Sequence, residues 1–153
     1  WTGSIVSIHI SPRRARDLQS VEHVRAVPRQ GLKGDRFFTE ADSSDPVTPD
    51  HEVTLIELEA IDALKAEYGV SISPGQARRN IVTKDVPLNH LVGKQFNVGK
   101  VKLRGIRLCE PCGHLAKLTE PKVSQGLIHR GGLRAQILTE GTIHVGDEVL
   151  PAD

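Results

Sequence analysis

The sequence predicts a mainly β protein with a few α-helices, formed by a single domain over residues 1–153. Short apolar runs alternate with glycine-rich turns along most of the chain, which is typical of small barrels and sandwiches. The apolar residues are chiefly aliphatic, and aromatic residues make up only 3%, so an aliphatic core is expected. A length of 153 residues suits one domain with one hydrophobic core.

The first third of the chain is predicted to contain two strands and one long loop. Residues 3–10 alternate in the manner of a half-buried strand, with Val6 and Ile8 expected on the same face. A second short strand is expected over residues 21–27, because a proline follows the run. Residues 39–50 show no apolar period, so we expect a surface loop there.

One amphipathic helix is predicted after a strand over residues 51–56. Apolar residues recur there every three or four positions, and Gly69 ends the pattern as a helix cap. The apolar stripe is expected to cover one side of the β core and comprises Leu55, Leu58, Ile61, Leu64 and Tyr68.

The second half of the chain is predicted to form short strands separated by glycine turns. A helical turn is expected over residues 88–91, and a further helix is expected to start at Glu120 and Pro121. The strands are expected over residues 81–83, 94–98, 101–108, 135–138 and 142–150, the last with a tight turn at 145–149.

The strand over residues 101–108 carries an irregularity at Gly105, where its apolar residues change phase. A bulge at this glycine would restore one apolar face. The residues brought to the core side would be Val101, Leu103, Ile106 and Leu108. Arg107 and Cys109 would then point away from the core, toward a groove bordered by the sheet.

The charge balance excludes several classes of partner. A formal net charge of +1 provides no overall field for nucleic acid or a membrane surface. No apolar run reaches the roughly 18 to 20 residues that cross a bilayer, and the N-terminus lacks a signal-peptide pattern. A cytoplasmic protein is expected. The chain starts at Trp1 and contains no methionine, which leaves an upstream segment open.

The only two cysteines, Cys109 and Cys112, lie three positions apart around a proline, just past a predicted strand. The loop between them is too short to staple a fold as a disulfide. Such a pair is better interpreted as a chemical handle than as packing. A reactive thiolate needs nearby positive charge or a helix N-terminus, and the sequence offers both around Cys112.

Several short motifs, each unspecific when taken alone, follow one another in order over most of the chain. They are Gly34-Asp35-Arg36, Pro74-Gly75 before Arg79-Asn80-Ile81, Leu91-Val92-Gly93 before Phe96-Asn97-Val98-Gly99, Pro111-Cys112, and Arg130-Gly131-Gly132-Leu133 before Gly141-Thr142-Ile143 and Gly146-Asp147. In this order and spacing they resemble the MOSC domain. That module occurs at the C-terminus of molybdenum cofactor sulfurases and as free-standing small proteins.

The resemblance implies a small MOSC-type β-barrel with a reactive cysteine. In the family this cysteine is held to carry sulfur or to approach the molybdenum of a pterin cofactor. Cys112 matches it by position, and would be the molybdenum ligand if the cofactor is held. Cys109 is an addition to the family pattern, and we interpret it as a second thiol that could resolve a persulfide on Cys112 into a disulfide. The sulfurases' pyridoxal-phosphate domain has no room in this chain, so that cofactor is not expected.

A molybdopterin ligand, which the resemblance implies, carries a phosphate and a flat polar ring system. Arginine forks and exposed main-chain amides bind such groups. Arginines beside glycine or asparagine in turns are therefore candidates, and paired glycines favour Arg130 because they let backbone approach a ligand closely. The expected contacts are Arg36, Arg79, Asn80, His129, Arg130, Gly131, Gly132 and Arg134.

Two other interpretations of the cysteine segment stay open. Cys109, Cys112, His114 and His129 could form a structural zinc site, although His114 follows too closely for ordinary finger spacing. A thiol-disulfide oxidoreductase is a further interpretation, but no βαβ unit is visible. The other histidines show no ligand spacing and are expected to be ordinary residues: His9, His23, His51, His90 and His144.

Two functional hypotheses follow from the resemblance. In the first, the protein is a carrier that passes sulfur or cofactor to another protein, with a cysteine desulfurase as a partner. In the second, it is the cofactor-bearing part of a small molybdenum-dependent oxidoreductase that reduces N-hydroxylated compounds with electrons from a partner protein. Both hypotheses assign the reactive atom to Cys112.

Overall fold

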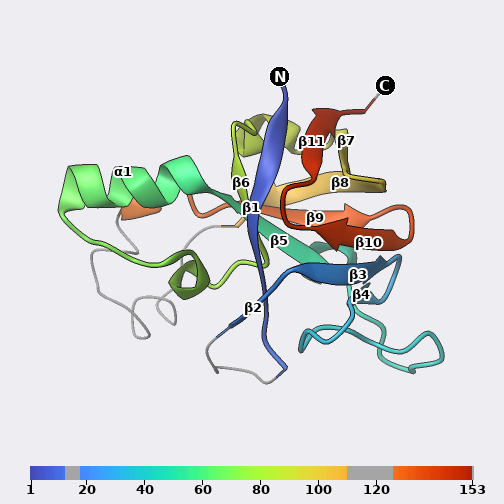
Figure 1. Ribbon diagram of the computed structural model, residues 1–153. Helices are drawn as coiled ribbons and strands as arrows, with labels where there is room; N and C mark the ends of the chain where they lie inside the picture. The colour runs from blue at the N-terminus through green and yellow to red at the C-terminus, as the bar shows by residue number, and fades with distance from the viewer. Residues whose placement is uncertain (13–17, 110–125, 153) are drawn as a thin grey trace.

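The computed structural model of the protein describes residues 1–12, 18–109 and 126–152, and is mostly β (Figure 1). Its strands are β1 (Gly3–Ile10), β2 (Gln19–Val21), β3 (His23–Val27), β4 (Gly31–Leu32), β5 (Val53–Glu57), β6 (Ile81–Lys84), β7 (Gln95–Val98), β8 (Val101–Leu108), β9 (Leu133–Ile137), β10 (Gly141–His144) and β11 (Glu148–Pro151). The helical elements are α1 (Leu58–Tyr68) and the short 3-10 helices η1 (Pro49–His51), η2 (Pro74–Ala77) and η3 (Leu88–Leu91).

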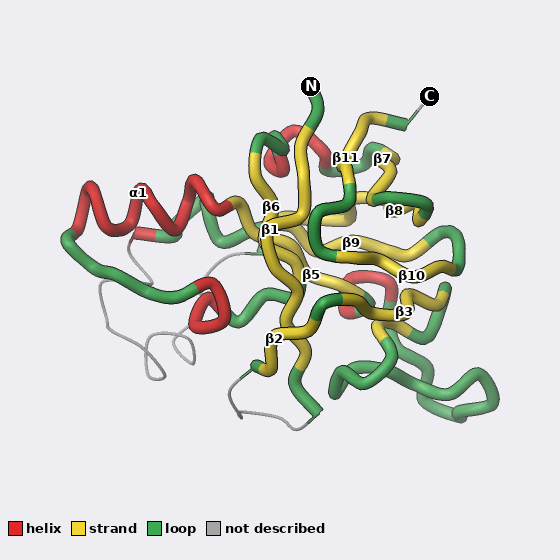
Figure 2. The backbone as a smooth tube through the Cα atoms, viewed as in Figure 1, coloured by secondary structure: helices red, strands yellow, loops and turns green. Residues whose placement is uncertain are grey.

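Seven strands close into a barrel, which confirms the predicted fold class. They follow one another in the order β11, β7, β8, β9, β5, β6 and β1. The ring closes where β1 pairs with β11, at Gly3 with Val149 and Ser4 with Glu148. Strands β5 and β6 are parallel, and β2 extends the sheet beyond β1. Strands β10, β3 and β4 form a smaller sheet beside the barrel (Figure 2).

The chain passes between the two sheets at two neighbouring points. The strand expected over residues 21–27 is two strands, because β2 pairs with β1 whereas β3 pairs with β10. The turn expected after residue 144 is present, with Gly146 at φ 91°, and it sends β10 and β11 to different sheets. The two crossing points are bonded together, since the N–H of Val145 donates to the carbonyl of Glu22 at 2.9 Å.

A bulge in β1 changes which of its side chains enter the barrel. The pairing with β6 shifts register between Ile5 and Ser7. As a result Ile5 and Ile8 both lie in the barrel core, while Val6 packs in a second cluster outside it. The prediction that Val6 and Ile8 share a face is wrong, because the alternation restarts after the bulge.

The bulge predicted in β8 is present. The register against β9 shifts between Gly105 and Arg107, which makes Ile106 the extra residue. Leu108 packs against the core as expected, but Ile106 is only half-buried. Arg107 is exposed, as predicted. Cys109 is 1% exposed, so the expectation that it faces a groove is wrong.

Helix α1 lies on the outside of the barrel, where it covers a second hydrophobic cluster (Figure 1). It begins at Leu58, later than the apolar repeat indicated, because Leu55 belongs to β5. It ends at Gly69, whose φ is 68° and whose N–H donates to the carbonyl of Lys65 at 2.9 Å. The cluster comprises Ile56, Ala60, Ile61, Leu64, Val70, Ala77, Val82 and Leu127.

Several predictions concern residues outside the described ranges. These are the helix expected from Glu120 and Pro121, and the side chains of Cys112 and His114. Within the ranges that are described, no helix has both the length and the apolar character needed to span a membrane.

Candidate anion-binding site

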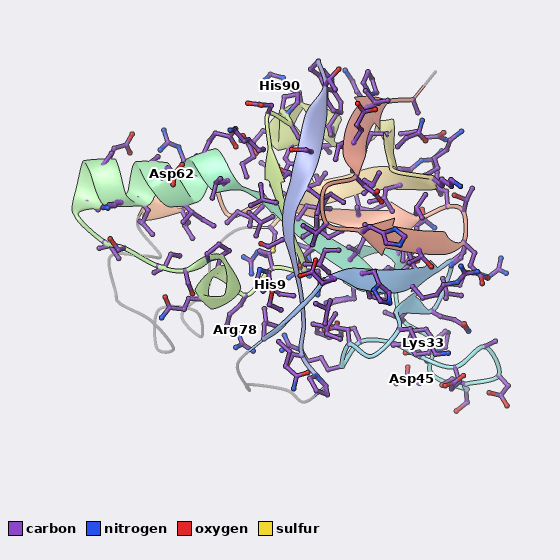
Figure 3. All side chains as sticks on the ribbon, in the orientation of Figure 1. His9, Lys33, Asp45, Asp62, Arg78 and His90 are labelled. Atoms are coloured by element: carbon purple, nitrogen blue, oxygen red, sulfur yellow. The ribbon has the colours of Figure 1, made fainter. Side chains whose placement is uncertain are left out.

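Arginines from three separate parts of the chain meet in one pocket at an end of the barrel. They come from the turn after β4, from the loop between η2 and β6, and from β9. Figure 3 shows Arg78 and His9 near each other at this end of the molecule. The pocket, called the arginine pocket below, has a volume of about 110 Å³, and its basic side chains are Arg36, Arg78, Arg79, Arg134 and His51.

Arg36 is positioned by a turn built around Asp35. The carboxylate of Asp35 accepts hydrogen bonds from the N–H groups of Ser11 at 2.9 Å and Phe37 at 3.5 Å. The N–H of Arg36 in turn donates to the carbonyl of Ser11 at 2.6 Å. The guanidinium of Arg36 lies 4.8 Å from the ring centroid of Phe37, close enough for a cation–π contact. The turn therefore presents a cation and an aromatic ring side by side at the pocket.

The short helix η2 delivers the next two arginines. Its N-terminus carries a capping box between Ser73 and Gln76, and Arg78 ends it in the left-handed region at φ 58°. A side chain other than glycine is unusual there, and such strained residues cluster at functional sites. Arg79 follows, and its Nε donates to the carbonyl of Gly131 at 2.8 Å.

Asn80 holds three strands together at the floor of the pocket and is 9% exposed. Its Oδ1 accepts from the N–H and the hydroxyl of Thr54, at 3.0 and 3.1 Å. Its Nδ2 donates to the carbonyl of His9 at 3.1 Å. Asn80, one of the expected cofactor contacts, lines the pocket, but both polar atoms of its amide are already bonded within the protein. It therefore fixes the spacing of β1, β5 and β6.

Arg134 reaches the pocket from β9, and one of its donors has no acceptor. Nη1 donates to the carbonyl of Asp50 at 3.3 Å, whereas Nε is buried and has no hydrogen-bond partner in the described part of the chain. A buried N–H left without an acceptor costs about 1–3 kcal/mol. An anionic ligand would supply the missing acceptor.

Asp50 organises the basic groups next to the pocket. Its Oδ2 accepts from the guanidinium of Arg107 at 3.1 and 3.2 Å, and its Oδ1 accepts from the hydroxyl of Thr48 at 2.8 Å. The hydrogen bond from Thr48 holds the pKa of Asp50 below its ordinary value, and Arg107 and His51 act in the same direction. Asp50 is therefore ionised at neutral pH.

The balance of charge in the arginine pocket favours an anion. Four guanidinium groups line it, and Asp35 is the one carboxylate among the described lining residues. That carboxylate is already bonded to main-chain donors. Several guanidinium forks aimed at a small volume are suited to phosphate, sulfate or carboxylate groups.

The comparisons with known proteins agree with this fold. The sequence pattern of the MOSC domain matches residues 42–150, which is most of the chain. The chain belongs to the MOSC domain family. The resemblance predicted from the short motifs is thereby confirmed, and the family is associated with the molybdenum cofactor.

Solved structures similar to this MOSC domain cover nearly its whole length. The YuaD protein from Bacillus subtilis has a TM-score of 0.82 at 14% identity, over 97% of this chain and 94% of that one. YiiM from Geobacillus stearothermophilus has a TM-score of 0.74 at 18% identity, over 99% and 75%. YiiM from Escherichia coli has a TM-score of 0.70 at 14% identity, over 98% and 70%. None of the curated proteins that were compared matches the sequence.

The loop before β9 of the MOSC domain, residues 129–132, holds four of the expected cofactor contacts. None of its residues is among the described residues that line the pocket. Arg130 instead pairs with Glu67 of α1 at 3.1 Å, and the carbonyl of His129 accepts from Asn89 at 2.7 Å. Gly132 has φ 108°, and a Cβ there would collide with the main-chain oxygen of Leu55. This glycine thus serves close packing on β5.

Of the two cysteines of the MOSC domain, only Cys109 lies in the described part of the chain. Cys109 is buried, and its N–H donates to the carbonyl of Gly132 at 2.7 Å, which continues the pairing of β8 with β9. Cys112 lies outside the described residues. For the zinc alternative, no three ligand side chains come together in the described ranges, and two of its four predicted ligands lie outside them.

His51, Arg78 and Phe37 line the arginine pocket, although no sequence pattern assigned them to a site. His51 was expected to be an ordinary histidine because it has no ligand spacing, and Phe37 carried no motif. The one available signal was the doubled arginine at 78 and 79, next to an asparagine. Which residues face one another here is set by the closure of the barrel, and no local pattern encodes it.

Proposed function

We propose that this MOSC domain binds a molybdenum–pterin cofactor or a sulfur-loaded form of it in the cytoplasm. The arginine pocket would hold the anionic end of the cofactor, and Cys112 would supply the reactive sulfur. The observation that carries the proposal is that Arg134 lines a pocket with four guanidinium groups and has a buried Nε with no acceptor among the described residues.

The residues fit the phosphate of such a cofactor. A volume of about 110 Å³ is well below the roughly 300 Å³ at which whole small-molecule sites begin. The pocket therefore has room for one anionic group, and the ring system would lie outside it. Arg36, Arg79 and Arg134 would hold the phosphate, and the exposed ring of Phe37 offers an aromatic surface beside it.

The chain's own residues would bind the cofactor, orient it and shield it. The guanidinium groups offset the charge of the phosphate, and Asp35 and Asp50 hold Arg36 and Arg134 in place through main-chain and side-chain bonds. When bound, the cofactor supplies a redox-active metal. A cysteine desulfurase or an electron-transfer protein would be the partner.

The proposal is tested by producing the protein in a host that makes the cofactor and measuring molybdenum per chain after purification. The wild type is expected to retain molybdenum or to accept persulfide sulfur from a cysteine desulfurase. Cys112→Ser should lose the sulfur loading, and Arg134→Gln should lose the molybdenum. Arg104→Gln, at an exposed position of β8, is the matched control and should behave as the wild type.

The same preparation separates the two forms of the proposal. Stoichiometric molybdenum with reductase activity on an N-hydroxylated compound favours the oxidoreductase. A metal-free protein that takes up persulfide favours the carrier. Equal molybdenum in the wild type and in both the Cys112→Ser and Arg134→Gln variants, with equal sulfur loading, would contradict the proposal, and stoichiometric zinc in their place would support the structural zinc site.

A further inference from the structure

His51 is the one histidine among the described residues that line the arginine pocket. It is the last residue of η1, and its ring lies 5.4 Å from that of Phe37, measured between centroids. The side chain is 39% exposed, so it is accessible to protons from solvent. Its charge state therefore changes the charge of the pocket.

The structure fixes the side of the ring that can gain a proton. Thr48 donates its one hydroxyl proton to Oδ1 of Asp50 at 2.8 Å. Nδ1 of His51 lies 2.7 Å from the same hydroxyl and 3.2 Å from that carboxylate oxygen. The hydroxyl oxygen of Thr48 and the carboxylate oxygen of Asp50 can then only accept a hydrogen bond from His51. Nδ1 must therefore be the donor. The neutral ring thus carries its proton on Nδ1, and Nε2, on the side away from Asp50, keeps a bare lone pair.

We propose that His51 is a further anion contact of the arginine pocket, and that it binds the anion together with a proton taken up on Nε2. This rests on the proposed function, because it takes the arginine pocket as the anion site. A bare lone pair on Nε2 repels an oxyanion, whereas the imidazolium donates a charge-assisted hydrogen bond to it. By linkage, a bound anion favours the protonated ring, and acid pH favours the bound anion.

The charged groups around His51 explain why anion binding is coupled to protonation of its ring. On its own turn, Asp50 stabilises the imidazolium, while Glu52 is engaged by the N–H groups of Arg29 and Ile137. Across the pocket Asp35 is the other carboxylate. The opposing cations are Arg36, Arg78, Arg79, Arg107 and Arg134. These guanidinium groups disfavour a further charge on His51, and a bound anion offsets that repulsion.

Sulfate is a suitable probe because it stays a dianion over the range in which histidine titrates. Its Kd for the full chain is measured by calorimetry at constant ionic strength, between about pH 8 and about pH 5.5. In the wild type the Kd is expected to fall about tenfold toward acid pH, because the anion is bound together with a proton. Proton uptake appears as a binding heat that depends on the buffer's ionisation enthalpy.

Variants assign the proton to His51. His51→Gln keeps an amide donor but cannot titrate, so its sulfate Kd should be flat with pH and its proton uptake absent. His51→Asn repeats the measurement with a shorter amide. His144→Gln, at an exposed histidine of β10, is the control and should keep the pH dependence of the wild type.

The outcomes separate this inference from the proposed function. Sulfate binding that is flat with pH in the wild type, or that stays pH-dependent in both His51 variants, overturns the role of His51 alone. Sulfate binding that is absent, or that is unchanged in Arg134→Gln, shows that the arginine pocket is not an anion site. That result overturns the inference and the proposed function together.

Discussion

Arg79 donates a hydrogen bond from Nε to the main-chain carbonyl of Gly131, across 2.8 Å and 52 positions of sequence. The arginine lies just before β6 and the glycine just before β9, so one guanidinium ties together two segments that approach the arginine pocket. The same side chain lines the pocket. The residue that anchors this loop is therefore also one of the proposed contacts of the anion.

Replacing Arg79 should loosen the loop over residues 126–132. Arg79→Gln removes a charge-assisted hydrogen bond, and the free energy of unfolding should fall by about 1.5–3 kcal/mol. Amide hydrogen exchange near Gly131 should accelerate more than exchange in β9. Arg104→Gln provides the control, because its side chain is exposed on β8. Equal effects of the two substitutions on exchange in the loop would contradict the anchoring role.

Gly132→Ala should be among the most destabilising small substitutions in the chain. The residue has φ 108°, and the new methyl group would collide with the main-chain oxygen of Leu55. A loss of about 3 kcal/mol or more in the free energy of unfolding is expected from strain and collision together. Gly93→Ala, at φ 77° with open space around it, should lose only about 1–2 kcal/mol. Urea denaturation measures both, and equal losses would show that the contact with Leu55 does not matter.

Asn80→Ala should destabilise the barrel by leaving buried groups without partners. The N–H of Thr54 and the carbonyl of His9 both lose their partner. We expect a loss of about 2–4 kcal/mol in the free energy of unfolding. A double-mutant cycle with Thr54→Val isolates the pair, and a coupling energy near zero would contradict the hydrogen-bonded arrangement.

Glu52 should make stability fall as pH rises from the acid range toward neutral. Burial raises the pKa of this carboxyl above 4.5, its value in the unfolded chain, although two main-chain N–H groups oppose the shift. The folded state thus holds the proton more tightly, and its contribution is complete below 4.5 and is lost as pH passes the folded value. Glu52→Gln should remove this loss, so its stability relative to the wild type should improve between about pH 4 and about pH 7. A difference that is constant with pH would be inconsistent with a raised pKa.

Cys109 should react slowly with a thiol reagent in the folded protein. Its side chain is 1% exposed, and access requires local opening. In Cys112→Ser it is the only thiol, so the reaction of that variant with a disulfide reagent reports Cys109 alone. Reaction should be complete in denaturant and strongly retarded without it. Rapid native reaction would restore Cys109 as a chemical handle.

Much of the fold could be predicted because the sequence patterns that indicate its elements lie within short segments of the chain. The alternation of β1, the phase change at Gly105 and the cap at Gly69 each involve residues close in sequence, and each element was placed. The faces of β1 could not be predicted, because the bulge after Ile5 arises from pairing with β6, far along the chain. The break between β2 and β3 at Glu22 could not be predicted for the same reason. It arises because β2 pairs with β1 whereas β3 pairs with β10, far along the chain.

The candidate site was predictable only in part for a related reason. Arg36, Arg79 and Arg134 were selected because turns present arginine to ligands, and the fold brings all three together. Arg130 has the same local setting but pairs with Glu67, because α1 passes beside it. His51 was not selected, since its place in the pocket depends on the hydroxyl and carboxylate around it and on neighbours that are distant in sequence.

The seam between β1 and β11 constrains how the chain is made. On the edge of β1 opposite β6, Gly3 and Ser4 find their partners only at Val149 and Glu148, while β2 pairs with the other end of that edge. As the polypeptide leaves the ribosome, this end of the edge stays open until β11 has emerged, so the ring closes only after β11 is made. A nascent chain halted before residue 148 would display an unpaired strand edge, ready to pair with another chain.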